Sequence, residues 1–454
     1  MNDSAQTRRR FLKTSASLLA MPTIIPATAI GKGGRPAPSE RVHVGLFGFG
    51  TIAQATTPGF LSDKRAQVIA VADPAIELTH YGYAGELTGG RTVAKAYVEK
   101  YYAENEAKRG DFKSCTAYED YREMLDGEDL DAVNISTPDH WHAKMCIDAA
   151  AKGCHIYGQK PLALTVQQGR QMSDAVANAG VAWQTGSQQR SDIYFRTACE
   201  FVRNKRLGKV HTVKVLLPGG HKDWSKLGNQ QAVAPVPKGF NFDLWQGPAP
   251  VRDYRPALLP LQWRHNYDYS GGMVTDFGAH HIDIVHWALD MDSSGPTKIE
   301  KISGTLPKAT ELYNTASDFH FECLYGDKRM VVSSDRSSTG GIVFEGEGGK
   351  SIHVTRDSLE MTPTELRREK IGDDEIKLYE SRDHVKNFIE CIYSGKPTVA
   401  PIEAAHRTIT VSHLANIGMR LGKGSIDWDP KTERSTDAEV NRRLSRPMRA
   451  PYAL

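Results

Sequence analysis

A glycine-rich turn follows directly on the short apolar run Val-His-Val-Gly-Leu-Phe. The turn fits the pattern Gly48-x-Gly50-x-x-Ala53. In a strand–turn–helix unit, the first glycine permits the tight turn and the second lets a pyrophosphate approach the backbone. The small third residue keeps the helix close to the strand. The pattern therefore predicts a dinucleotide site in which the backbone amides of Thr51 and Ile52 face the phosphates at a helix N-terminus.

An acidic residue ends the next apolar stretch. Residues 67–72 are typical of a buried strand, and Asp73 follows them. A carboxylate at this place accepts a hydrogen bond from the adenosine ribose 2′-hydroxyl and repels a 2′-phosphate. Pro74 comes next and no arginine stands nearby, so we expect NAD rather than NADP. A helix-capping role for Asp73 is the alternative.

Strand-like and helical segments alternate after this unit, which predicts an α/β fold. Such alternation is typical of a Rossmann domain with a doubly wound parallel sheet, here over residues 42–188. The strand-like segments are 132–136, 155–157 and 181–185, and the helical ones between them are 142–152 and 166–179.

The second half of the chain has a different order of strand-like and helical segments. Strand-like segments follow one another without long helices, and two helical segments close the domain. This predicts an α+β substrate and oligomerisation domain over 189–430, with a large, mostly antiparallel sheet. Residues 219–270 form a loop-rich insert, and 431–454 are expected to be a solvated arm packed over the surface. The strand-like segments are 209–217, 299–305, 317–325, 329–334 and 341–345, and the helical ones are 382–393 and 402–421.

The N-terminus carries a basic motif. Residues 7–13 read Thr-Arg-Arg-Arg-Phe-Leu-Lys, which fits the bacterial twin-arginine pattern at every position. The apolar segment after it is too short and too broken by proline to cross about 30 Å of hydrocarbon. We therefore expect an export signal in 1–29, a linker in 30–41 and a periplasmic or extracytoplasmic location. An uncleaved anchor is the alternative.

That signal accounts for the whole net charge of the chain. The chain has 57 Lys and Arg against 54 Asp and Glu, and the first 29 residues hold four and one of these. The rest carries 53 of each and is neutral, which argues against a nucleic-acid partner. The six cysteines form no C-x-x-C pair. We interpret them as small buried apolar residues.

Two further motifs narrow the range of protein families that the sequence resembles. The first is D-A-V-N-I-S-T-P-D-H-W-H at 131–142, followed by G-Q-K-P-L at 158–162. The second is S-G-G-M-V-T-D-F-G-A-H-H-I-D at 270–283. Together with the glycine fingerprint, they resemble the glucose-fructose oxidoreductase / inositol dehydrogenase / MocA (Gfo/Idh/MocA) family. The resemblance extends from about residue 42 to the tail.

The resemblance implies roles for three residues. Lys160 would contact the nicotinamide and the reacting hydroxyl, Asp276 would orient the substrate or Lys160, and His280 would act as general base. The family's usual E-K-P tripeptide has Gln159 in place of its glutamate. The chemistry agrees, because imidazole suits proton removal near neutral pH and a fixed ammonium stabilises negative charge developing on oxygen.

Further residues are candidates for ligand contact. The segment after the third strand resembles the family's nicotinamide-side loop and supplies Thr137, Pro138, His140 and Trp141. Hydrogen-bond donors and aromatic faces that suit sugars are Gln188, Arg190, Trp263, Arg264, His265, Tyr267 and His281. His280, His281, Asp283 and His286 could suggest a metal site, but the helix continues as an apolar segment, so we expect no metal.

These observations predict an NAD(P)-dependent oxidoreductase that acts on a secondary hydroxyl of a sugar, glycoside or polyol. Because an exported enzyme has little free NAD around it, the cofactor should be tightly held. The alternatives are a glycoside-cleaving or eliminating enzyme that uses NAD transiently, and a non-catalytic sugar or NAD sensor. We also expect no stable transmembrane segment and a homo-oligomer that assembles through the C-terminal sheet.

Overall fold

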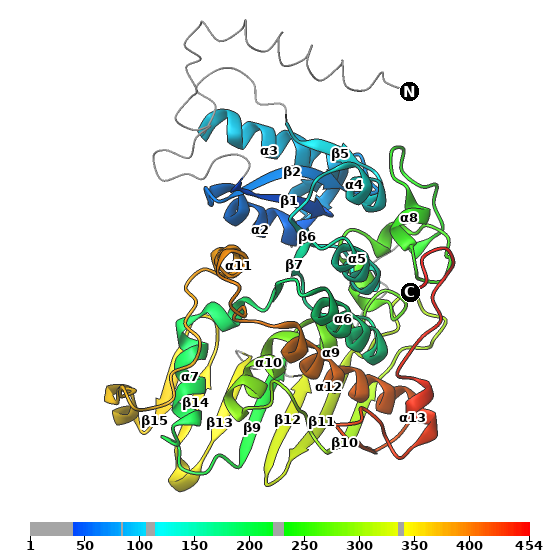
Figure 1. Ribbon diagram of the computed structural model, residues 1–454. Helices are drawn as coiled ribbons and strands as arrows, with labels where there is room; N and C mark the ends of the chain where they lie inside the picture. Colours follow the sequence, from blue (N-terminus) through cyan, green and yellow to red (C-terminus); the bar gives the residue numbers. More distant parts are fainter. Residues whose placement is uncertain (1–39, 83–84, 106–113, 221–230, 335–339) are drawn as a thin grey trace, which may run out of the picture. The chain divides into compact units, whose positions relative to one another are not determined.

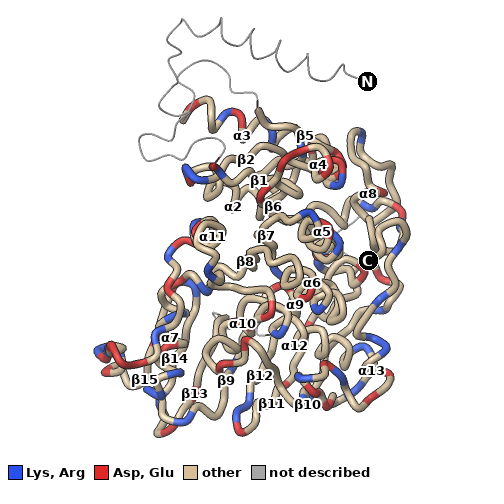
Figure 2. The backbone as a smooth tube through the Cα atoms, in the orientation of Figure 1, with Lys and Arg blue, Asp and Glu red and all other residues tan. Residues whose placement is uncertain are grey.

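A computed structural model describes residues 40–82, 85–105, 114–220, 231–334 and 340–454. Residues 42–454 form one compact unit. The predicted export signal and nearly all of the linker lie outside the described residues. In the part that is described, no helix is both long and apolar enough to cross a membrane. Basic and acidic residues are interspersed over the described part of the molecule (Figure 2).

The N-terminal half builds a six-stranded sheet in which every neighbouring pair is parallel, in the order β5-β2-β1-β6-β7-β8 (Figure 1). This confirms the predicted doubly wound Rossmann sheet. Its direction of winding reverses between β1 and β6, where such sheets bind ligands. The strands are β1 (Val42–Phe47), β2 (Ala66–Ala72), β5 (Thr116–Tyr118), β6 (Ala132–Ile135), β7 (His155–Gly158) and β8 (Trp183–Thr185).

Helices connect these strands. α5 begins three residues before the predicted start, because Pro138 sits at its N-cap with a helix-compatible φ of −63° and Asp139 lies in its first turn. α6 is capped by the Thr165 side chain and ends at Gly180. The helices are α2 (Thr51–Ser62), α3 (Arg91–Asn105), α4 (Tyr121–Gly127), α5 (Asp139–Ala151) and α6 (Val166–Ala179).

The C-terminal half builds an eight-stranded sheet in the order β15-β14-β13-β9-β12-β11-β10-β16. Only β9 and β12 pair in parallel, so the predicted, mostly antiparallel sheet is confirmed. The strands are β9 (Thr212–Leu217), β10 (Lys298–Thr305), β11 (Asp318–Tyr325), β12 (Lys328–Ser334), β13 (Gly341–Glu345), β14 (Ser351–Val354), β15 (Leu359–Thr362) and β16 (Ser425–Asp427).

Helices cover one face of this sheet. They are α7 (Ile193–Arg203), α10 (Gly278–Leu289) and α12 (Ile402–Leu421), as Figure 1 shows. Along β9, Val213 and Val215 are fully buried while Lys214 points the other way. On that other face the side chains form ion pairs, as Lys214 does with Glu345 at 2.6 Å.

The chain then returns to the first sheet. Helix α11 (His384–Ser394) places Phe388 against Phe60 and Tyr157, in the core beside β1 and β2. The short helices α8 (Phe242–Gln246) and α9 (Met273–Asp276) lie in and just after the loop-rich insert.

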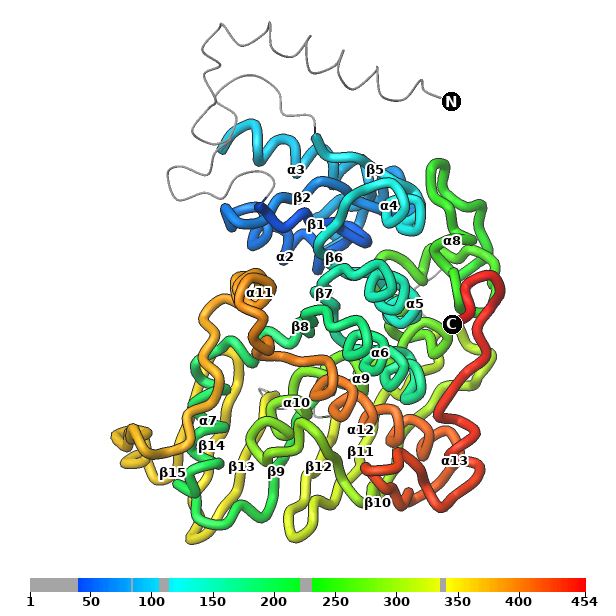
Figure 3. The backbone as a smooth tube through the Cα atoms, viewed as in Figure 1, coloured from blue at the N-terminus to red at the C-terminus, as the bar shows by residue number. Residues whose placement is uncertain are grey.

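The C-terminal segment, predicted as a solvated arm packed over the surface, packs against α8 and α5. After α13 (Ala438–Arg442) it runs beside α8 (Figure 3), where Arg449 pairs with Asp243 at 2.6 Å. Tyr452 is 6% exposed and its ring lies 5.3 Å from that of Trp141. Aromatic burial therefore outweighs the polar composition of the tail.

Candidate active site

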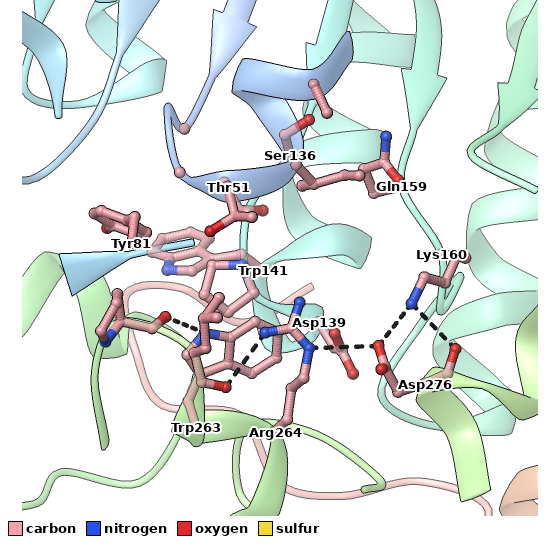
Figure 4. Close-up of a pocket in the computed structure, with 18 of the residues that line it drawn as sticks. Thr51, Tyr81, Ser136, Asp139, Trp141, Gln159, Lys160, Trp263, Arg264 and Asp276 are labelled. Carbon is pink, nitrogen blue, oxygen red and sulfur yellow. Dashed lines mark hydrogen bonds and ion pairs between the residues drawn. The ribbon is translucent and has the colours of Figure 1, made fainter. Parts of the chain in front are cut away.

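A cavity of about 680 Å³ opens at the switch point between β1 and β6. Its walls come from both halves of the chain, from the glycine turn at one end to α9 and α10 at the other (Figure 4). A drug-sized ligand needs about 300–1,000 Å³. The cavity is therefore of the right size for much of a dinucleotide or for a sugar beside one.

The glycine turn forms one end of the cavity. Gly48 has φ +81°, and a Cβ there would lie 3.0 Å from the Ser136 carbonyl oxygen, so a glycine is required. Helix α2 begins after Gly50 with no side-chain cap. Its first residues, Thr51 and Ile52, line the cavity. An uncapped helix N-terminus of this kind fits a pyrophosphate.

Ala53 takes a different place in the same motif. It is fully buried in the core beneath α2 and does not line the cavity. Its small side chain serves the contact between helix and sheet, as the fingerprint implies.

Asp73, the residue predicted to bind the adenosine ribose, lines the cavity beside the glycine turn. Its carboxylate accepts hydrogen bonds from the backbone N–H of Phe49 at 2.9 Å and of Ala75 at 2.8 Å. Burial raises the pKa of this carboxyl group, which these two hydrogen bonds oppose. Because each carboxylate oxygen can accept a second hydrogen bond, the residue fits a ribose hydroxyl donor.

One expectation about this end was wrong. An arginine does stand near Asp73, because Arg91 comes from 18 residues further on and donates to the Asp73 carbonyl oxygen at 3.0 Å. Its guanidinium also pairs with Glu119 at 2.9 Å, and Glu119 lines the cavity. The positive charge of Arg91 is therefore balanced by the carboxylate of Glu119.

Lys160, Asp276 and Arg264 meet at the other end (Figure 4). Lys160 Nζ donates to Asp276 Oδ1 at 2.6 Å, and Arg264 Nε lies 3.4 Å from the same oxygen. Burial alone would raise the pKa of Asp276, but the two cations outweigh it and hold the pKa well below its usual range. Asp276 is therefore an anion that fixes the Lys160 ammonium.

His280 lines the same end of the cavity from the first turn of α10. It is 5% exposed, and its Nδ1 has no hydrogen-bond partner among the described residues. Burial, with the nearby charges of Lys160 and Arg356, holds the pKa of the ring well below its ordinary value. The imidazole is therefore neutral near pH 7.

Gln159 stands just before Lys160 and also lines the cavity. Its side chain is 3% exposed, and neither of its amide atoms has a partner in the described structure. Gly186 leaves room for it, because a Cβ there would come within 2.4 Å of Gln159 Oε1. A buried amide without partners is costly and fits a polar ligand group.

Several lining residues were not singled out from the sequence. Asp139 is 4% exposed and accepts from the Ser270 hydroxyl at 2.6 Å, and burial raises its pKa. Its place in the first turn after Thr137 and Pro138 was the available signal. Phe277, within the second motif, was also passed over, and other such residues, which carry no local pattern, are Tyr81, Glu119, Gln189, Phe240 and Arg356.

The predicted nicotinamide and substrate residues divide into two groups. Those that line the cavity are Thr137, Pro138, Trp141, Gln188, Trp263, Arg264 and His265. Trp263 and Arg264 are in contact, with the guanidinium 4.6 Å from the ring centroid. Aromatic faces beside donors of this kind suit a sugar.

The other predicted residues do not line the cavity, because each is used in packing. His140 bonds to the Trp245 carbonyl oxygen at 2.9 Å, and burial lowers its pKa to about 3.

Arg190 is 1% exposed and pairs with Asp283 and Asp292. Tyr267 lies between the guanidinium groups of Arg420 and Arg446. His281 is 7% exposed and faces Gln189.

No group of three or more potential metal ligands occurs among the residues that the structure describes. The six cysteines are all buried and none forms a disulfide.

Relatives of known name share parts of the sequence. A levoglucosan dehydrogenase of Pseudarthrobacter phenanthrenivorans is 26% identical over 201 residues, which cover 44% of this chain and 42% of that protein. A glycosyl hydrolase family 109 protein of Shewanella sp. (strain ANA-3) is 30% identical over 182 residues, which cover 37% and 36%. The chain thus spans less than half the length of these relatives.

Solved structures share the fold. An aldose-aldose oxidoreductase from Caulobacter crescentus has a TM-score of 0.57 at 16% identity, over 85% of this chain and 99% of that one. The WlbA dehydrogenase from Bordetella pertussis, in complex with NADH and UDP-GlcNAcA, has a TM-score of 0.55 at 16% identity, over 82% and 94%.

Family profiles cover nearly the whole described chain. Residues 42–187 match the oxidoreductase family's NAD-binding Rossmann fold, and residues 200–454 match its C-terminal alpha/beta domain. The chain belongs to the Gfo/Idh/MocA oxidoreductase family and carries that family's NAD-binding Rossmann domain.

Proposed function

We propose that the protein is an NAD-dependent oxidoreductase that removes hydride from a secondary hydroxyl carbon of a sugar, glycoside or polyol. The observation that carries this proposal is a single cavity with two ends. One end is the uncapped α2 N-terminus with Asp73, and the other holds Lys160, Asp276 and His280. The named relatives include dehydrogenases of sugar-like compounds, which supports the substrate class.

The residues would share the chemistry as follows. The bound nicotinamide supplies the hydride acceptor. Neutral His280 takes the hydroxyl proton while the carbonyl forms, and the Lys160 ammonium stabilises negative charge on the same oxygen. Asp276 fixes Lys160 in place through the 2.6 Å contact. Trp263 offers an aromatic face to the sugar ring.

The adenosine end favours NAD over NADP. Asp73 and Glu119 both line it, and the charge of Arg91 is already met by Glu119. A 2′-phosphate would meet two carboxylates there, with no free cation among the described residues that line this end. NADP should therefore bind much more weakly than NAD.

A second function is supported by one observation, the 30% identity to a glycosyl hydrolase family 109 protein. In this alternative the same residues would oxidise a glycoside transiently, so that the neighbouring C–H becomes acidic and the glycosidic bond is eliminated. The two functions differ in products, because only the second releases a leaving group without net reduction of NAD.

The location and assembly are also proposals. The twin-arginine motif at 7–13 supports export to the periplasm with the cofactor already bound and tightly held. The face of the eight-stranded sheet opposite α10 and α12 carries ion pairs such as that of Lys214 with Glu345. We propose that this face joins two copies of the chain.

The function is tested by incubating purified protein with nitrophenyl glycosides and with free sugars and polyols. Absorbance near 340 nm reports reduced nicotinamide, and absorbance near 400 nm reports released nitrophenol. An oxidoreductase gives the first signal only, and a cleaving enzyme gives the second. A protein that binds NAD but gives neither signal, even with levoglucosan and inositols, would support the sensor alternative.

A further inference from the structure

Two segments outside the six-stranded sheet lie against the phosphate and adenosine end of the cavity. One is the hairpin of β3 (Leu78–Tyr81) and β4 (Leu87–Gly89), which was not predicted. The other is residues 239–241, within the loop-rich insert of the C-terminal half. Each contributes an aromatic side chain to the cavity wall, Tyr81 and Phe240.

The hairpin is tied to the nucleotide-binding turn itself. Three hydrogen bonds connect it to the glycine turn and to the first turn of α2. They are Gly82 N–H to Thr51 Oγ1 at 2.9 Å, Gln54 Nε2 to the Thr88 carbonyl oxygen at 2.9 Å, and Gly90 N–H to the Phe49 carbonyl oxygen at 3.3 Å.

These hydrogen bonds place Tyr81 between two glycines. A Cβ on Gly50 would lie 2.9 Å from the Tyr81 ring, and a Cβ on Gly89 would lie 2.8 Å from it. The ring is therefore packed against the backbone at the second fingerprint glycine, where a pyrophosphate approaches. Because the cavity also reaches Gly48, Thr51 and Asp73, the ring is a wall beside this space (Figure 4).

The insert segment closes the same end from the other half of the chain. Phe240 forms a β-bridge with Ala75, two residues after Asp73. Ile76 N–H donates to the Gly239 carbonyl oxygen at 2.7 Å. Asn241 N–H donates to the Pro74 carbonyl oxygen at 2.9 Å, and its Nδ2 donates to Glu119 at 2.7 Å.

We propose that Tyr81 and Phe240 cover the adenosine and pyrophosphate half of bound NAD and retain it, so that release requires the hairpin or the insert to detach. This inference rests on the proposed function only in taking NAD as the ligand. It adds a structural cause for tight binding, which lies in two segments outside the βαβ unit. It also accounts for a long insert that crosses from the second half to the end of β2.

The test measures how fast NADH leaves the full-length protein. Protein loaded with NADH is mixed with excess NAD⁺, and the loss of bound-NADH fluorescence gives the dissociation rate. Tyr81→Ala removes the ring. Asn241→Asp keeps the Oδ1 acceptor that caps α8 but sets a carboxylate against Glu119. Tyr393→Ala is the control, because Tyr393 is a half-exposed tyrosine on α11 that does not line the cavity.

We expect Tyr81→Ala and Asn241→Asp to speed NADH dissociation by at least about tenfold, since affinity changes fall mainly on dissociation rates. Tyr393→Ala should leave the rate unchanged. Unchanged or slower dissociation in Tyr81→Ala, in a variant that melts with the control, would overturn the inference. Wild-type protein that holds NADH firmly but oxidises no sugar would overturn the proposed function alone, and failure to bind any NAD would overturn both.

Discussion

Asp276 is the anion at the end of the cavity that holds Lys160, and its carboxylate faces two cations at once. Lys160 comes from the loop after β7 and Arg264 from the insert, and both approach the same oxygen. A buried anion between two cations keeps its charge, so the Lys160 ammonium stays beside it. The orientation of Lys160 therefore depends on a residue more than a hundred positions away in the sequence.

Replacing this anion tests that dependence. We expect Asp276→Asn to lower kcat by about 100-fold, since the amide holds Lys160 without its charge and small misplacements of a reacting group cost about that much. The dissociation constant for NADH, measured by fluorescence titration, should change less than about twofold. A variant with normal kcat would contradict the role of Asp276 as the residue that positions Lys160.

The pH dependence of the reaction reports on His280. Its pKa is well below that of free imidazole, chiefly through burial, so the neutral ring that accepts a proton persists as the pH falls through 6.5. We expect kcat/KM to stay flat between about pH 8 and pH 6, because this parameter reports the free enzyme. An inflection near pH 6.5 that is lost in His280→Gln would show that the ring titrates normally.

At the scale of elements, the buried ion pair of Arg190 joins the segment that follows β8 to helix α10. Arg190 lies in the 3-10 helix Gln188–Ser191 after β8, and Asp283 lies on α10, one turn beyond His280. The pair is 2.8 Å long, with side chains 1% and 3% exposed. It therefore sets α10, and with it His280, against the segment that follows β8.

Breaking this pair should destabilise the fold. We expect Arg190→Ala to lower the free energy of unfolding by about 3–5 kcal/mol, because Asp283 is left buried without a counter-ion. Urea unfolding followed by circular dichroism measures this. The control is Lys152→Ala, which removes a solvent-exposed pair with Asp126 and should behave as wild type. Equal midpoints for the two variants would contradict the structural role of Arg190.

Elements with a local signature could be predicted from the sequence, and elements defined by distant partners could not. β1, α6, β13 and α12 have the predicted bounds because their apolar runs and flanking turn residues are contiguous. β14, β15 and β16 were missed. Each has only three or four residues and is stabilised by pairing across the sheet edge.

The same distinction explains the candidate site. Lys160, Asp276 and His280 lie in motifs with fixed spacing. Arg190 and Tyr267 carry the same donor and aromatic chemistry as a sugar site, and the sequence does not show that Asp283 or Arg420 engages them. Likewise Arg91 reaches Asp73 only through the fold of α3.

At the scale of the whole molecule, the net charge is confined to the N-terminal segment. The first 29 residues carry the entire net charge of +3, and the rest is neutral. This charge distribution fits an export signal that precedes a neutral chain, whose proposed active site is an internal cavity. Residues from both halves line that cavity, and α11 and the C-terminal segment both return to the Rossmann half.

The export signal can be tested on the intact chain. We expect replacement of Arg8 and Arg9 by lysines to keep the protein in the cytoplasm of a bacterium with a twin-arginine pathway, because that pathway reads the arginine pair. Fractionation with immunoblotting measures this, and NADH binding by the retained protein shows that it is folded. Normal export of the double variant would contradict the signal.

The central claim is that one cavity brings NAD and a secondary alcohol together at Lys160 and His280. The most direct measurement is absorbance near 340 nm of purified, NAD-loaded protein while sugars, glycosides and polyols are added. The account predicts a rise of up to one equivalent with at least one of them, slowed by about 100-fold or more in Lys160→Ala. A rise at the same rate in Lys160→Ala, or firmly bound NAD that no such alcohol reduces, would contradict it.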